Sequence, residues 1–273
     1  MRDAMAADGY CIFHGLLNPD EVAALRRSLA AHFTARWNWE GLGKHQPFAS
    51  SLIPAIGWIF THPRILDVFR SLTDSPHLVF PGNCDAHMNM LSWWHKDTGE
   101  GQGGCFEGDY FARPELRVFR AGIYLQDHLD NAQGLHVRPN SHMTRSPLAG
   151  QAISLPTRAG DVIFFDIRLS HAGQLADPIE TLLLRATQWL RAPAAGFQAK
   201  EAWRLLTRKA DKLSLFFTYG APTPDTEQYC HFELAARQRA GIPAALSLPP
   251  ALRLALANSH VACNPWLLAQ PVE

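Results

Sequence analysis

The chain has 273 residues, 47% of them hydrophobic, and its 25 basic and 25 acidic side chains cancel to a formal net charge of zero. This length and apolar content suit a single domain spanning residues 1–273. The balanced charge gives no sign of a nucleic-acid or anionic-membrane partner, and no apolar run is long enough to span a bilayer. The five cysteines form no CxxC pair and no signal-peptide stretch opens the chain, so we expect a reduced, cytoplasmic protein.

The N-terminal part is predicted to be helical. Asn18 can cap a helix that begins at Pro19, and Glu21 completes a capping box three residues after the cap. Apolar residues then recur at helical spacing, at Val22, Leu25, Leu29 and Phe33. A second helix is expected to begin near Thr61–Pro63.

After Pro76 the pattern changes to short apolar runs separated by turn residues. Seven segments are predicted to be strands: 77–80, 86–95, 116–127, 134–139, 151–156, 161–167 and 181–190. Many short strands without helices between them favour an antiparallel sandwich or jelly roll, with its core at about 76–192. Helical patterns return in an extension at about 195–273. The glycine-rich insertion 98–114 has the length of a functional loop, such as a lid.

The segment SWWHKDTG, residues 92–99, contains a candidate for half of a metal site. Because side chains alternate along a strand, His95 and Asp97 point to the same side and can converge on one ion. His171 follows an apolar strand and offers a third ligand. Two histidines and one carboxylate leave three positions on ferrous iron for a co-substrate and dioxygen. The alternative for His95 and Asp97 is a hydrogen-bonded pair at a strand end.

An arginine lies in the last predicted strand, TLLLRATQWL. Arg185 is flanked there by apolar residues, and a buried arginine needs an anion. Its guanidinium can grip a carboxylate through two parallel hydrogen bonds. Arg191 is the rival for this role.

Three more residues share the predicted strand face with His95. Asn89 is a candidate to hydrogen-bond to a co-substrate. His87 is a candidate substrate contact, with a satisfied core histidine as the alternative, and Trp93 is a candidate pocket wall, with simple packing as the alternative.

Five segments in this order resemble the phytanoyl-CoA dioxygenase family of Fe(II)/2-oxoglutarate-dependent oxygenases. They are DGYCIFHGLLNPDEVAALRRSL, WWHKD, GLHVRPNSH, AGDVIFFDIRLSHAG and RATQWL, and the resemblance covers roughly residues 8–192. It implies a double-stranded β-helix, a cupin-like jelly roll, with N-terminal helices and a helical C-terminal extension. The family's Pro-Gly-Ser-His loop reads Pro139-Asn140-Ser141-His142 here, and asparagine tolerates the left-handed turn conformation that glycine would supply.

The resemblance also implies an activity. His95, Asp97 and His171 would bind Fe(2+), and Arg185 would hold the far carboxylate of 2-oxoglutarate. Dioxygen would then be used to hydroxylate a small or medium-sized metabolite, with release of succinate and CO2. The presence of Asp97 disfavours halogenation, because related halogenases have a small residue there.

Alternatives to this activity remain open at the level of sequence. The same cofactors support desaturation or ring formation. A jelly-roll metalloenzyme that does not use 2-oxoglutarate and a non-catalytic jelly-roll binding protein are further alternatives. The sequence indicates neither the substrate nor the oligomeric state.

Overall fold

The computed structural model describes residues 1–35, 39–40, 43–99, 104–106, 108–114, 116–129, 133–239 and 247–268. At its centre is a large sheet in the order β1-β9-β6-β11-β5-β3-β2, with β4 joined to β11 and β12 joined to β4. Its strands are β1 (Tyr10–Phe13), β2 (Trp39–Glu40), β3 (Gly43–Pro47), β4 (Leu78–Phe80), β5 (Cys84–Met88), β6 (Val118–Tyr124), β9 (Val162–Asp166), β11 (Leu213–Gly220) and β12 (Val261–Cys263).

A smaller sheet faces the large one. It has the order β10-β7-β8, with β7 (His136–Val137), β8 (Ile153–Ser154) and β10 (His171–Ala172). The two sheets pack through one apolar cluster, formed by Tyr124, Leu135, Val137, Leu155, Ile163, Phe165, Leu169 and Phe216. Two antiparallel-rich sheets with a core between them are the jelly-roll arrangement that the sequence predicted.

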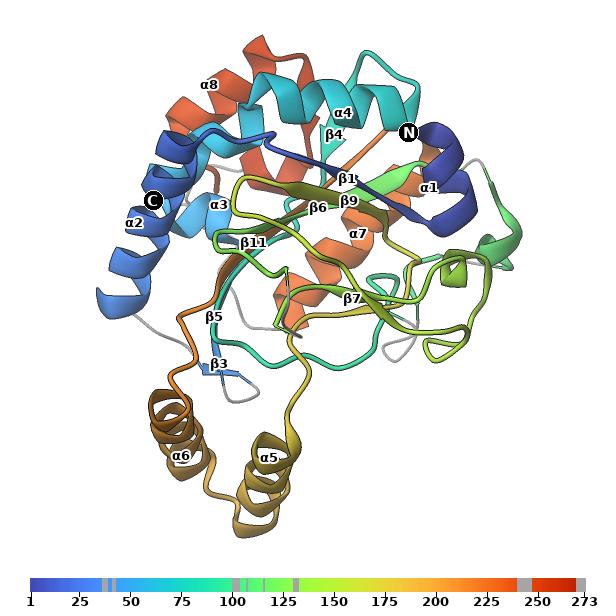
Figure 1. The fold of residues 1–273 in the computed structure, drawn as a ribbon. Helices are drawn as coiled ribbons and strands as arrows, with labels where there is room; N and C mark the ends of the chain where they lie inside the picture. Colours follow the sequence, from blue (N-terminus) through green and yellow to red (C-terminus); the bar gives the residue numbers. More distant parts are fainter. Residues whose placement is uncertain are drawn as a thin grey trace.

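Helices cover the other face of the large sheet (Figure 1). They include α2 (Pro19–Ala35), α3 (Ala49–Leu52), η1 (Pro54–Thr61), α4 (Pro63–Thr73) and α8 (Pro250–Asn258). The remaining helices are α1 (Arg2–Asp8), η3 (Tyr110–Ala112), η4 (Ser141–Met143), α5 (Pro178–Leu190), α6 (Pro193–Leu206), α7 (Pro224–Arg239) and η5 (Pro265–Leu268). No helix of the described residues has both the length and the apolarity needed to cross a membrane.

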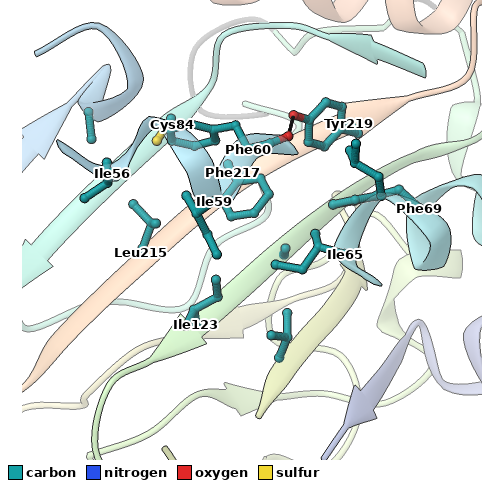
Figure 2. Packing of buried hydrophobic residues seen from close by; sticks show 14 of the residues in the cluster. Ile56, Ile59, Phe60, Ile65, Phe69, Cys84, Ile123, Leu215, Phe217 and Tyr219 are labelled. Carbon is teal, nitrogen blue, oxygen red and sulfur yellow. Dashed lines mark hydrogen bonds between the residues drawn. The ribbon is translucent and has the colours of Figure 1, made fainter. Parts of the chain in front are cut away.

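The central strand β11 divides its side chains between two cores. Leu215 and Phe217 point into the helix-covered core, where Figure 2 shows them beside residues of η1 and α4. Ser214 and Phe216 point the other way, into the space between the sheets. The Tyr219 hydroxyl donates to the Phe60 carbonyl at 2.6 Å and so joins this strand to η1.

The predicted N-terminal helices are confirmed. In α2 the Glu21 amide donates to Asn18 Oδ1 at 3.0 Å, and the Asn18 amide donates to a Glu21 carboxylate oxygen at 2.7 Å. The four apolar residues expected to face the core, Val22, Leu25, Leu29 and Phe33, are all buried. The second helix, α4, begins at Pro63 as predicted.

The strand predicted at 181–190 is wrong, because this segment belongs to helix α5. Asp177 caps the helix: its side chain accepts from the Glu180 amide at 2.7 Å, and the Glu180 side chain accepts from the Asp177 amide at 3.0 Å. This capping box and Pro178 at the first helical position favour a helix, and their effect outweighs the strand preference inferred from the apolar run. Figure 1 shows α5 and α6 as a hairpin that projects from the sheets.

The predicted limits of the jelly-roll core also need correction. Strand β11 lies between β6 and β5 in the large sheet, although its residues were expected in a helical extension. The same sheet includes β1 and β3, which precede residue 76. The helical insertion α5–α6 therefore separates two strands of one core, and residues 199–217 form the end of α6 and the start of β11 instead of one helix.

The described part of the 98–114 insertion is packed. Cys105, Phe106, Tyr110 and Phe111 are buried in one cluster with Tyr229 of α7. Residues 100–103 and 107 lie outside the described residues, so the prediction of a lid is not settled by this packing.

Candidate active site

His95, Asp97 and His171 converge at one end of the smaller sheet. The backbone of His95 pairs with that of His171 through two hydrogen bonds of 3.0 Å, and the Asp97 amide donates to the Ile167 carbonyl at 2.9 Å. One potential ligand atom from each side chain lies within 4.8 Å of the other two. Asp97 Oδ1 is 3.8 Å from His95 Nε2, and Oδ2 is 3.7 Å from His171 Nε2. The three groups are close enough to share one metal ion.

Backbone carbonyls fix both imidazoles in the orientation that a metal needs. His95 Nδ1 donates to the Trp93 carbonyl at 2.7 Å, and His171 Nδ1 donates to the Leu169 carbonyl at 3.0 Å. Each ring therefore carries its proton on Nδ1 and presents the lone pair of Nε2. Burial lowers the pKa of His171 to about 3, against the opposing effect of Asp97, which keeps this imidazole neutral.

The carboxylate of Asp97 is held ionised by Arg120. Burial acts to raise its pKa, but the charge of Arg120, together with His171 and His95, outweighs burial and lowers it. Arg120 Nη1 forms an ion pair with Oδ1 at 3.1 Å, whereas the buried Oδ2 has no hydrogen-bond partner among the described residues. A buried, unpaired carboxylate oxygen that lies 3.7 Å from the Nε2 of His171 is what a bound divalent cation would satisfy, so these residues fit ferrous iron.

The three groups open into a cavity of about 200 Å³ between the two sheets. Lys212, Ser214 and Tyr124 line it from β11 and β6. Among the described residues, no group hydrogen-bonds to the Tyr124 or Ser214 hydroxyl. Polar groups in a cavity without protein partners are available to a ligand.

Lys212 is a buried cation without a paired acid. Its Nζ donates to the Met90 carbonyl at 2.9 Å, and no carboxylate of the described residues lies within ion-pair distance of it. Burial, followed by the charge of Lys200, lowers its pKa to about 7. An anion in the cavity would restore the charged form.

Two of the predicted site residues, Asn89 and Trp93, do not line the cavity. Asn89 was a candidate for the co-substrate, but its Nδ2 donates to Asp211 at 2.9 Å and its Oδ1 accepts from the Lys212 amide at 2.8 Å. Its backbone has a left-handed φ of 54°, so the predicted alternation of side chains along the strand does not continue past Asn89. Trp93, expected as a pocket wall, is 54% exposed and does not line the cavity, whereas His87 does.

Arg185 is not where the sequence placed it. It lies on the exposed side of α5 and does not line the cavity. The predicted burial failed because it assumed a strand, while the helix turns Arg185 away from the apolar contacts of Leu183 and Leu184. The rival, Arg191, is exposed at the end of the same helix.

The sequence reasoning missed Arg120, Lys212, Asp85 and His45, all of which line the cavity. The signal for the first two was a cation at or within an apolar strand, in VFRAGIY and in KLSLFFTYG. The left-handed turn at Asn140 was predicted correctly, because its φ is 63°.

Comparison with known families identifies the family of this chain. The family model described as phytanoyl-CoA dioxygenase (PhyH) matches residues 5–175. The chain belongs to the phytanoyl-CoA dioxygenase family. It is therefore a non-haem iron- and 2-oxoglutarate-dependent oxygenase, and the family and enzyme class predicted from the sequence are confirmed. No curated protein matches the sequence.

Solved structures of this enzyme group share the fold. The epimerase SnoN from nogalamycin biosynthesis is 18% identical with a TM-score of 0.56, over 81% of each chain. EctD from S. alaskensis, solved with 2-oxoglutarate and 5-hydroxyectoine, is 17% identical with a TM-score of 0.55, over 81% of this chain and 74% of that one. HygX from Streptomyces hygroscopicus, solved with nickel and 2-oxoglutarate, is 16% identical with a TM-score of 0.54, over 81% and 87%.

Proposed function

We propose that this oxygenase holds ferrous iron with His95, Asp97 and His171 and hydroxylates a small or medium-sized metabolite. The observation that carries the proposal is the convergence of these side chains, with the unpaired Asp97 Oδ2 among them, at the wall of a cavity between the two sheets. When bound, the iron together with 2-oxoglutarate and dioxygen supplies the oxidising power, with succinate and CO2 as co-products.

Lys212 replaces Arg185 in our assignment of the co-substrate anchor. A buried ammonium without a paired acid, in the same cavity as the iron ligands, supports binding of the far carboxylate of 2-oxoglutarate. The hydroxyls of Ser214 and Tyr124 line the same part of the cavity and can donate to that carboxylate. These groups orient the co-substrate so that its other end reaches the iron.

The metal assignment is tested by binding of Mn(II), followed by its electron paramagnetic resonance signal. We expect His171→Ala and Asp97→Asn each to weaken binding by about 100-fold, because one of three ligands is lost. The exposed His77→Ala is the matched control and should bind as the parent does. Unchanged Mn(II) binding in both ligand variants would refute the assignment.

The co-substrate assignment is tested by titrating 2-oxoglutarate into the Ni(II)-loaded protein in a calorimeter. Lys212→Ala should weaken binding by about 100-fold, since a charge-assisted contact contributes on the order of 3 kcal/mol. Arg185→Ala should leave the affinity unchanged. The reverse result would restore Arg185 as the anchor, and full binding in both variants would remove 2-oxoglutarate from this part of the cavity.

The reaction outcome is read from the product mass. Structural neighbours include an epimerase and a carbocyclase, so ring formation or desaturation with the same cofactors is the alternative to hydroxylation. A gain of one oxygen atom by the substrate supports hydroxylation, whereas loss of two hydrogens supports desaturation or ring formation. Release of succinate alone tests the use of 2-oxoglutarate.

The cellular setting is proposed from the cysteines. All five, Cys11, Cys84, Cys105, Cys230 and Cys263, are free thiols, which supports a reducing compartment such as the cytoplasm. A small-molecule substrate is proposed from the cavity of about 200 Å³, and neither nucleic acid nor a membrane is part of the proposal.

A further inference from the structure

Three polar side chains outside the iron and co-substrate groups line the cavity from β3 and β5. His45 lies opposite His87 in the strand pair, and their rings are 4.9 Å apart. Asp85 lies two residues before His87 on β5 and so faces the same side. These three residues, His45, Asp85 and His87, are called the β3–β5 wall below. They share the cavity with the iron ligands, so a molecule bound against the wall is next to the reacting centre.

His87 presents unused hydrogen-bonding capacity to the cavity. Its ring is packed against His45 and, at 5.6 Å between centroids, against Phe216. No group of the described residues hydrogen-bonds to either of its nitrogens. Burial, followed by the charge of His45, holds its pKa well below the usual range, so the ring is neutral. A neutral imidazole has one donor and one acceptor, which matches a hydroxyl group.

The neighbouring imidazole is held in place by a chain of charged groups. His45 Nε2 donates to Asp85 Oδ1 at 3.2 Å, and the other oxygen of Asp85 accepts from Arg120. Arg120 also forms an ion pair with Asp97. Because Arg120 and His45 already engage the Asp85 carboxylate, it is not free to pair with a cationic substrate. Its visible role is to fix the orientation of His45.

With ferrous iron and 2-oxoglutarate bound, the positive and negative charges in the cavity would cancel. Its lining holds two carboxylates, Asp85 and Asp97, and two cations, Arg120 and Lys212. The two charges of ferrous iron cancel those of a 2-oxoglutarate dianion. Among the described lining residues, no unpaired charge is left for a charged substrate, which would lose its hydration without a compensating ion pair. The apolar side chains of Met90 and Phe216 border the wall and can pack against a carbon skeleton.

From these observations we infer that the β3–β5 wall is the substrate subsite and that it selects an uncharged, hydroxyl-bearing molecule, with His87 as the hydrogen-bonding partner of one hydroxyl. This inference rests on the proposed function, because it places the substrate beside iron held by His95, Asp97 and His171. The ring of His45 packs against that of His87 on the same wall, and Asp85 fixes the orientation of His45.

The selection by charge is tested with three sugars that share one ring: glucose, which is neutral, glucosamine, which is cationic, and glucuronate, which is anionic. Binding to the protein loaded with Zn(II) and 2-oxoglutarate is followed by saturation-transfer NMR, which detects weak ligands. We expect glucose to bind at least tenfold more tightly than either charged sugar. Preference for a charged sugar, or binding of none of the three, would overturn the inference.

The role of His87 is tested with the same measurement on two variants. His87→Phe keeps the ring stacking but has no donor or acceptor, so glucose binding should weaken at least tenfold. His87→Gln restores a donor and an acceptor and should recover part of the affinity. The exposed His77→Phe is the control. Equal glucose affinity in the parent protein and His87→Phe would overturn the assignment.

Failure of this inference can be told apart from failure of the proposed function. His87→Phe should leave Mn(II) affinity and 2-oxoglutarate affinity unchanged, because His87 belongs to neither site. If it instead weakens 2-oxoglutarate binding, the wall serves the co-substrate and the inference is wrong. If Lys212→Ala and His171→Ala leave co-substrate and metal binding intact, the proposed function itself is wrong.

Discussion

Arg120 joins Asp97 to Asp85 across the cavity. One guanidinium nitrogen forms an ion pair with Asp97 Oδ1 at 3.1 Å, and another donates a hydrogen bond to Asp85 on the sheet wall. Burial acts to lower the pKa of Arg120, but Asp97 and Asp85 outweigh it and raise the pKa, so the group stays charged. One buried cation thus orients a candidate iron ligand and, through Asp85, the imidazole of His45.

Arg120→Gln should destabilise the protein by about 3–5 kcal/mol, because two buried carboxylates lose their counter-charge. Ni(II) should restore part of this loss, since the metal compensates Asp97. The measurement is urea unfolding with and without Ni(II), and the metal should stabilise the variant more than the parent. Arg185→Gln, on the exposed side of α5, is the control. A metal effect of the same size in both proteins would show that Arg120 does not act on the metal site.

The affinity for 2-oxoglutarate should depend on pH through Lys212. In the free protein its pKa is lowered to about 7 by burial and then by Lys200, so the ammonium is charged below that pH and loses its proton above it. Because the dianion binds the charged form, affinity should be constant below pH 7 and fall by up to about tenfold per pH unit above it. Calorimetry from about pH 6 to about pH 9 measures this.

Lys212→Arg provides the matched comparison for the pH profile. A guanidinium stays protonated throughout this range, so its 2-oxoglutarate affinity should not change with pH. If the variant and the parent protein show the same decline, the titrating group is elsewhere in the cavity.

Asn89→Ala should lower the free energy of unfolding by about 2 kcal/mol. The change removes the amide that joins Asp211 to the Lys212 backbone, and it places a β-carbon at a φ of 54°. Asn89→Gly keeps the backbone conformation free of strain and should cost less. Thermal unfolding of both variants checks the order. A larger loss in the glycine variant would assign the stability to something other than backbone strain and hydrogen bonding.

Tyr219→Phe should cost about 1–3 kcal/mol, because the buried Phe60 carbonyl loses its donor while the ring packing is kept. Tyr219 faces the helix-covered core, so Mn(II) and 2-oxoglutarate affinities should not change. Chemical denaturation measures the first expectation and calorimetry the second. A change in co-substrate affinity at unaltered stability would contradict this placement.

Local sequence patterns were sufficient to predict several features of the structure. The Asn18-Pro19-x-Glu21 start fixed the beginning of α2, since its hydrogen bonds are made within one turn. The HxD pair and the distant His171 were identified by residue type and spacing, and the structure brings all three together. The turn at Asn140 was predicted because left-handed geometry depends mainly on the residue that adopts it.

Only the tertiary structure decided which cation faces the cavity. Arg185 and Lys212 each lie beside apolar residues in the sequence. The Asp177-Pro178-x-Glu180 capping box is a local helix signal for the first run, but nothing local shows that the second run becomes a strand of the central sheet. The capping box at Asp177 directs the first run into a helix, while pairing with β5 and β6 makes the second run β11. Burial of a side chain depends on such long-range pairing, so residue order alone could identify the candidate iron ligands but not the proposed anchor at Lys212 or the link through Arg120.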